Sequence, residues 1–218
     1  MEKKDDNQTH LLVFLFIIFF FTKLVITSHF PLINDEAYTL TISRYFSLSY
    51  FDHPPLTMWI SYLFHNLNIS VSYMFRIPSI IFGLLTGYYL YKIASTVYRQ
   101  KNGTIAAILY FISPFFFFSG GFFVVPDASL NFSIAGATYV SLKLIFYNKD
   151  ETRLWLMLGL FLALAFLSKY QSFLFGITLF ISFIIWNKRL IFTVNFNLAL
   201  LISIFGLIPI LLWNIENN

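Results

Sequence analysis

The sequence contains no cysteine, and only 11% of its 218 residues are charged. Without cysteine, neither a disulfide framework nor a thiolate metal site can form. The low charge excludes an ordinary soluble domain, because such domains carry roughly 25% charged residues. Three catalytic or ligand-binding signatures are also missing from the sequence: a P-loop, a Gly-x-Ser-x-Gly turn and a His-x-x-His metal spacing.

Apolar residues dominate what remains, at 58% of the chain and a mean hydropathy of +0.75. These values predict an all-α polytopic membrane protein. The net charge of +4 requires no nucleic-acid partner, because basic residues at cytoplasmic helix ends produce the same excess. The first apolar run, of about 20 residues, can span a bilayer and lacks a small-residue cleavage site, so we expect a retained helix.

Seven apolar segments are candidates for transmembrane helices. They cover residues 11–30, 76–97, 104–122, 128–147, 154–168, 171–187 and 192–213. The two short segments on either side of Lys169 fit two spans better than one broken span, because about 33 residues exceed the needs of one tilted helix. No repeat or linker divides the chain, so we expect a single membrane domain over residues 1–218 with one long connection at 31–75.

The distribution of Lys and Arg predicts the orientation in the membrane. With the N-terminus in the cytoplasm, ten basic residues fall on the cytoplasmic side and three fall outside. The inner set is Lys3, Lys4, Lys92, Arg99, Lys101, Lys143, Lys149, Arg153, Lys188 and Arg189, and the outer set is Arg44, Arg76 and Lys169. We therefore expect a multi-pass protein of the cell membrane whose connection 31–75 is extracytoplasmic. Lys23, inside the first span, is compatible with snorkelling or with pairing to a carboxylate.

Two interfacial helices are predicted within the connection 31–75. Asn34 can cap the first helix, and Asp35 and Glu36 in its first turn suit the helix dipole. Aromatic and apolar residues then recur at helical spacing, and the sequence His-Pro-Pro breaks the pattern. The recurring residues are Tyr38, Ile42, Tyr45 and Phe46, the break is at 53–55, and the second helix runs from Leu56 to about Asn66.

The adjacent carboxylates of Asp35 and Glu36 point about 100° apart on a helix, so both cannot face one reacting atom. One can act as a base while the other binds a divalent metal, pairs with Arg44 or faces solvent. No ligand spacing requires a metal, and an acidic first helical turn is equally compatible with the pair.

Four further residues are candidates for binding a substrate. Asp52 and His53 lie at a corner stiffened by two prolines, which either holds their side chains in place or forms a plain surface turn. Arg76 and Lys169 lie on the outer side, where each can bind a phosphate or snorkel to lipid headgroups.

Asp127 follows Gly-Gly and Pro in "GGFFVVPDASL". It either lines a cavity or caps the next helix.

Six motifs, taken in order, give the chain a resemblance to one family. They are an acidic pair followed by Ala-Tyr at 35–38, Phe-Asp-His-Pro-Pro-Leu at 51–56, Arg-Ile-Pro-Ser at 76–79, Pro-Asp at 126–127, "LALAFLSKYQSFL" at 162–174 and "IPILLWNIENN" at 208–218. The chain resembles GT-C-fold membrane glycosyltransferases related to dolichyl-phosphate-mannose–protein mannosyltransferases and to bacterial aminoarabinose and lipid-linked-sugar transferases.

The resemblance implies a GT-C-like helical bundle and an activity. Such enzymes move a sugar from a polyprenyl-phosphate donor to a hydroxyl of a lipid, glycan or protein acceptor on the outer face, usually with inversion. By similarity, Asp35 is the candidate general base and Glu36 its neighbour in the motif. The residues available to neutralise the leaving phosphate are Arg44, His53, Arg76 and Lys169.

Family members are longer than this sequence, so we expect it to correspond to an N-terminal portion of such an enzyme. A second chain could then supply the missing C-terminal helices. Two other interpretations remain. One is a non-catalytic membrane protein that binds or transports lipid through its outer loop. The other is an inactive truncated remnant. Substitution of Asp35 distinguishes a transferase from a lipid binder, because only the transferase needs a positioned base.

Overall fold

The computed structural model describes residues 2–67, 72–147 and 151–217, and its regular secondary structure within these ranges is entirely helical, without a β-strand. The α-helices are α1 (Glu2–His29), α2 (Asn34–Ile42), α3 (Leu56–Asn66), α4 (Ile77–Val97), α5 (Gln100–Ile112), α6 (Pro114–Phe118), α7 (Pro126–Phe146), α8 (Thr152–Ser168), α9 (Ser172–Asn187), α10 (Val194–Phe205) and α11 (Ile208–Glu216). Two 3-10 turns, η1 (Ser72–Arg76) and η2 (Leu190–Phe192), precede α4 and α10.

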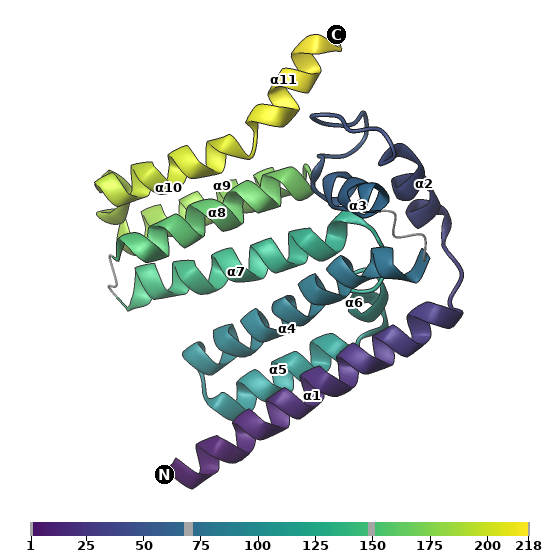
Figure 1. Cartoon of the computed structure of the whole chain (residues 1–218). Helices are drawn as coiled ribbons and strands as arrows, with labels where there is room; N and C mark the ends of the chain where they lie inside the picture. The colour runs from purple at the N-terminus through teal and green to yellow at the C-terminus, as the bar shows by residue number, and fades with distance from the viewer. Residues whose placement is uncertain (1, 68–71, 148–150, 218) are drawn as a thin grey trace.

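The long helices lie side by side, and α7 lies between α4 and α8 (Figure 1). The short helices α2 and α3 lie together at one end of this bundle, at the right in Figure 1. The N-terminus and the α4–α5 and α9–α10 connections lie at the opposite end. The fold therefore separates a bundle of apolar helices from a cap built largely from residues 30–67.

Four helical stretches are long and apolar enough to cross a membrane: His10–His29, Met74–Val97, Pro126–Phe146 and Val194–Glu216. This finding confirms the predicted all-α membrane fold, and the first three stretches match the predicted spans 11–30, 76–97 and 128–147. The helices α8 and α9 are also apolar but have only 17 and 16 residues. Their separation at Lys169, whose backbone is extended, confirms two segments rather than one.

Two predicted spans are interrupted. The segment 104–122 is not one helix, because α5 ends at Ile112 and α6 begins at Pro114. The residue before a proline avoids the α region, and Ser113 accordingly adopts φ −66° and ψ 120°. The segment 192–213 bends between α10 and α11, where Gly206 and Leu207 precede a proline in the first turn of α11.

The basic residues predicted to be cytoplasmic gather at one end of the bundle. Those described belong to the C-terminal parts of α4, α7 and α9, to the first turns of α1, α5 and α8, and to the short turns beside these helices. All these segments lie at the end of the bundle that holds the N-terminus (Figure 1). Lys149 lies outside the described residues. The membrane side that this end faces remains a prediction.

The two helices predicted within the connection 31–75 occur as α2 and α3, with differences at their ends. Ile33, not Asn34, is the N-cap of α2. The helix ends at Ile42, so Tyr45 and Phe46 lie beyond it and His-Pro-Pro is not what stops it. The Ser43 hydroxyl donates to the Leu40 carbonyl at 3.1 Å, which is the local competition that ends helices at serine.

Lys23 is buried in the bundle, with 1% of its surface exposed, and has no carboxylate partner among the residues that the structure describes. Its Nζ donates to the backbone carbonyls of Phe117 at 3.1 Å and Gly121 at 2.7 Å. These carbonyls belong to the end of α6 and the turn after it, where the helix supplies no further N–H groups. The lysine thus fixes this interrupted segment against α1.

A close contact between two glycines also fixes the segment after α6. A Cβ atom added to Gly83 of α4 would lie 2.6 Å from the Cα of Gly121. Only backbone atoms without side chains can approach this closely, as is common where helices pack inside membranes. The contact holds residues 120–124 against α4, and these residues lead to the buried amide of Val124.

Gly83→Ala is expected to lower stability by about 1–3 kcal/mol, because the added methyl group meets backbone that cannot rotate away. Gly176→Ala is the matched control, since its Cβ would meet only the Phe166 ring at 3.5 Å, an ordinary contact. The measurement is the thermal unfolding midpoint of each purified variant in detergent. Equal midpoints for the two variants would contradict the close contact.

Candidate functional site

The site begins with the first turn of α2, where Asp35 and Glu36 diverge. Asp35 is exposed and lines a cavity, whereas Glu36 is fully buried on the other side of the helix. This divergence follows from the rotation of about 100° between neighbouring helical residues. The two carboxylates therefore work in different environments.

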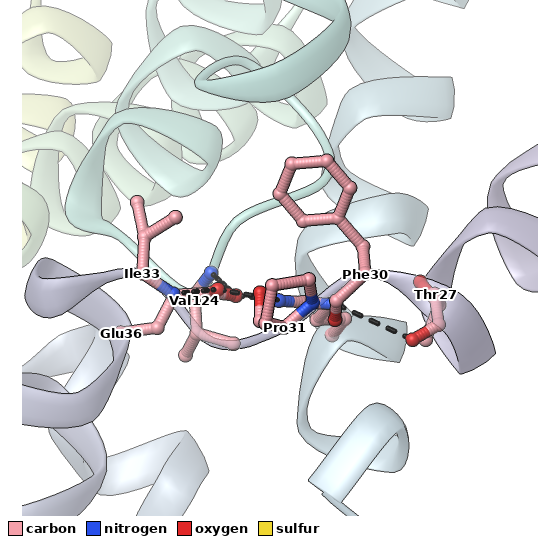
Figure 2. A network of polar contacts seen from close by, with 7 residues as sticks. Thr27, Phe30, Pro31, Ile33, Glu36 and Val124 are labelled. Carbon is pink, nitrogen blue, oxygen red and sulfur yellow. Dashed lines mark hydrogen bonds and ion pairs between the residues drawn. The ribbon is translucent and has the colours of Figure 1, made fainter.

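Glu36 forms a buried ion pair with Arg76, which has 1% of its surface exposed. Arg76 Nε lies 2.8 Å from Oε1 of Glu36, and Nη2 lies 2.6 Å from Oε2. The same carboxylate accepts from the backbone amides of Val124 at 3.1 Å and Ile33 at 3.2 Å. Figure 2 shows Ile33 and Val124 beside Glu36. Four N–H groups thus satisfy this carboxylate inside the protein.

The remaining donors of Arg76 bind the end of α1 and the residues that follow it. Nη1 donates to the carbonyls of Phe30 at 2.9 Å and Thr27 at 3.3 Å, and Nη2 donates to Pro31 at 2.9 Å (Figure 2). With two bonds to Glu36, these use all five N–H groups of the guanidinium. Arg76 therefore has no free donor for a phosphate in this arrangement.

A polar cavity of about 210 Å³ lies beside the exposed face of α2. It brings together five residues singled out from the sequence, which come from three separate parts of the chain. The lining is Asp35, Tyr38, Thr39, Asp52, His53, Val125, Pro126, Asp127 and Lys169. Glu36 and Arg76 are not part of this lining, and neither is Arg44, which is exposed beyond the end of α2.

Lys169 and Asp127 form an ion pair on one side of the cavity. The Lys169 Nζ lies 3.0 and 3.1 Å from the two carboxylate oxygens. Asp127 stands in the first turn of α7, where a negative charge suits the helix dipole. Lys169 lies in the extended break between α8 and α9, and its carbonyl accepts from the Ser172 hydroxyl at 2.6 Å. Both side chains are partly exposed, so the pair is accessible from the cavity.

Asp52 accepts a hydrogen bond of 2.9 Å from the Tyr38 hydroxyl. Partial burial, followed by this hydrogen bond and the charge of Asp52, raises the pKa of Tyr38, so its hydroxyl stays protonated at neutral pH. His53 Nε2 lies 3.9 Å from the other oxygen of Asp52. The sequence analysis did not identify Tyr38 and Thr39 as residues that line the cavity. Their positions i+3 and i+4 from Asp35, on one helical face, could have indicated this.

An apolar groove of about 300 Å³ runs between α8, α9 and α10. It is lined by apolar residues together with Ser203. Phe166 and Phe173 line it and stand three residues before and four residues after Lys169. Residues within four positions of Lys169 on either side thus line the groove.

Among residues 2–67, 72–147 and 151–217, no group of three or more His, Asp or Glu side chains gathers in a metal-binding arrangement. The structure therefore points to no specific ligand set for the divalent metal considered from the sequence.

Comparison with known proteins gives a family match over residues 52–213, to the family described as dolichyl-phosphate-mannose-protein mannosyltransferase. Two curated proteins of Proteus mirabilis (strain HI4320) also align over 124 residues, 56% of this chain. They are undecaprenyl phosphate-alpha-4-amino-4-deoxy-L-arabinose arabinosyl transferases 1 and 2, with identities of 27% and 26%. The alignments cover 23% and 22% of those proteins, so they span less than a quarter of each relative. No solved structure matches the chain significantly.

The family match includes the residues Asp52, His53, Asp127 and Lys169 of the polar cavity, and it begins after Asp35. It covers most of the chain and all helices from α3 to α10. This chain belongs to the dolichyl-phosphate-mannose-protein mannosyltransferase family.

Proposed function

We propose that this chain carries the donor side of a glycosyltransferase that moves a sugar from a polyprenyl-phosphate donor to a hydroxyl acceptor at the extracytoplasmic face of the cell membrane. The observation that carries the proposal is one cavity lined by an exposed carboxylate, Asp35, and a cation, Lys169, which lies in the chain between two residues of the apolar groove, Phe166 and Phe173. Family membership and the two arabinosyl transferase relatives support the same reaction class.

In this proposal Asp35 is the general base. It accepts the proton of the acceptor hydroxyl while the hydroxyl oxygen attacks the anomeric carbon of the sugar. The bond from that carbon to the phosphate oxygen breaks, and polyprenyl phosphate leaves with the bonding electron pair. A single displacement of this kind inverts the anomeric centre. Phosphate is a competent leaving group, so one base suffices without the paired carboxylates of glycoside hydrolysis.

Lys169 is the residue we assign to the donor phosphate. Its side chain is partly exposed and lines the cavity, and the prenyl chain would extend into the apolar groove lined by Phe166 and Phe173. Asp127 holds the ammonium in position through the 3.0 Å contact. A charge-assisted hydrogen bond from Lys169 also stabilises the negative charge that develops on the leaving phosphate.

The charges of the cavity indicate which kind of sugar it favours. Three carboxylates, those of Asp35, Asp52 and Asp127, face the single ammonium of Lys169, and His53 adds a charge only when protonated. An anionic sugar would meet repulsion here, whereas a neutral sugar or an amino sugar would find hydrogen-bond acceptors. The relatives named for 4-amino-4-deoxy-L-arabinose act on an amino sugar, in agreement with this polarity.

Glu36 and Arg76, expected from the sequence as a catalytic neighbour and a phosphate ligand, receive a different role in this proposal. Their charged groups bind each other and the surrounding backbone and do not line the cavity. We assign them as positioning residues that fix the first turn of α2, and with it Asp35. Arg44, expected to help with the phosphate, has no assigned role because it lies outside the cavity lining.

Asp35→Asn is expected to lower sugar transfer by about 10²–10⁴-fold, the usual contribution of a general base, and to leave donor binding intact. The measurement is transfer of labelled sugar from a panel of polyprenyl-phosphate donors in membranes that contain the chain. Glu216→Gln, which removes an exposed carboxylate of α11, is the matched control. Full transfer in Asp35→Asn would remove Asp35 from the chemical step, and donor binding without transfer in both the wild type and the variant would identify a lipid-binding protein without chemistry.

Glu36→Gln is expected to destabilise the protein by about 3–5 kcal/mol, because it leaves the Arg76 guanidinium buried without its counter-charge. Asp35→Asn, one residue away and exposed, should change stability little. Thermal unfolding in detergent gives both values. A Glu36→Gln variant with wild-type stability and no transfer would instead place Glu36 in the chemical step.

Lys169→Gln is expected to weaken binding of polyprenyl phosphate by about tenfold or more, the loss of one charge-assisted hydrogen bond. Stability should change little, because the ion pair with Asp127 is partly exposed. Titration of the purified protein with polyprenyl phosphate measures the affinity, with Lys188→Gln at the other end of the bundle as the control. Unchanged affinity in Lys169→Gln would remove this residue from the donor site.

A further inference from the structure

A second groove lies between α1 and α4, near the end of the bundle opposite the polar cavity. Its volume is about 470 Å³, and its lining is Leu12, Val13, Phe16, Ile17, Tyr88, Tyr91 and Lys92. Leu12 and Tyr91 are buried and belong to the packed core between α1, α4 and α5. Val13 and Ile17 are 53% and 50% exposed. The groove thus has a packed floor and an open, apolar side.

Lys92 gives this groove a positive charge. Among the described side chains it has no carboxylate partner and donates no hydrogen bond, unlike Lys23 and Lys169. Its Nζ lies 5.8 Å from the Tyr88 ring and 5.9 Å from the Tyr139 ring, which are weak cation–π contacts. A half-buried ammonium with free N–H donors is stabilised by an anionic group that enters the groove.

The position of the groove along the helices matches the boundary between hydrocarbon and headgroups. Lys92 lies five residues before Val97, the end of an apolar stretch that begins at Met74, or about 8 Å below that end at 1.5 Å per residue. Leu12 lies two residues inside the apolar stretch that begins at His10. A lysine at this depth extends toward the headgroups, and tyrosine is enriched there.

We propose that the α1–α4 groove binds a membrane phospholipid with an anionic headgroup. The lipid phosphate accepts hydrogen bonds from Lys92 Nζ and the Tyr88 hydroxyl, and one acyl chain lies along Leu12, Phe16 and Ile17. A free phosphate would use only the cation and would leave the apolar side uncovered, so the groove calls for an anion joined to a hydrocarbon chain. This site is separate from the polar cavity and independent of the proposed transfer reaction.

The experiment compares the thermal unfolding midpoint of the purified chain in nonionic detergent with added dioleoyl phosphatidylglycerol, dioleoyl phosphatidylcholine or glycerol 3-phosphate. The phosphatidylglycerol should raise the midpoint more than either of the others. In Lys92→Gln the extra shift should disappear, because the affinity for phosphatidylglycerol should fall by about tenfold or more. Lys101→Gln, an exposed lysine at the same end outside the groove, is the matched control and should keep the shift.

A second variant tests the hydrocarbon part without changing charge. Val13→Trp fills the open side of the groove, and it should abolish the phosphatidylglycerol shift while Lys92 is intact. Native mass spectrometry then counts the lipids that remain bound to each variant. The proposal is overturned if phosphatidylcholine or glycerol 3-phosphate stabilises as much as phosphatidylglycerol, if Lys92→Gln keeps the full shift, or if the groove is occupied by a second copy of the chain.

Discussion

The ion pair between Glu36 and Arg76 is the interaction on which the end of the bundle that carries α2 and α3 depends. It joins four separate parts of the chain: the end of α1, the start of α2, the start of α4 and the segment before α7. Two charges without access to water are costly unless every hydrogen-bonding group is satisfied, and here the carboxylate and the guanidinium both are. The pair therefore specifies one arrangement of these four segments, and a shifted arrangement would leave a buried charge unpaired.

This arrangement explains how two adjacent carboxylates come to have opposite roles. Glu36 is buried and fully hydrogen-bonded within the protein, and its burial turns the neighbouring Asp35 outward into the polar cavity. The close approach of Gly83 and Gly121 and the hydrogen bonds of Lys23 hold the segment that carries the Val124 amide. The position of Asp35 at the cavity thus depends on buried contacts on the far side of α2, which is the kind of support that the proposed general base requires.

Much of the fold follows from local sequence patterns. Apolar runs predict α1, α4 and α7, and an acidic first turn and an aromatic stretch predict α2 and α3. The error at 104–122 came from judging hydropathy without weighing Pro114, whose effect on Ser113 is local and could have been recognised. The membership of Asp35, Asp52, His53, Asp127 and Lys169 in one cavity agrees with their selection as site candidates.

The pairing of Glu36 with Arg76 could not be predicted in the same way. The two residues are 40 positions apart, and hydropathy and spacing do not encode which distant charges meet. Arg44, only eight positions from Glu36, was the nearer candidate partner in the sequence, yet it is exposed beyond the end of α2. The burial of both partners decides the pair, and burial depends on the packing of the whole outer end.

The shortness of α8 and α9 affects the bilayer around them. Helices of 17 and 16 residues are about 25 Å long, whereas the hydrocarbon core of a typical bilayer is about 30 Å thick. A membrane in contact with these helices adapts to such mismatch by thinning locally. Lys169 lies at the junction of the two short helices, so local thinning would bring the headgroup region closer to this lysine. In the proposed reaction, this would let the donor phosphate approach the cavity while its chain stays in the hydrocarbon.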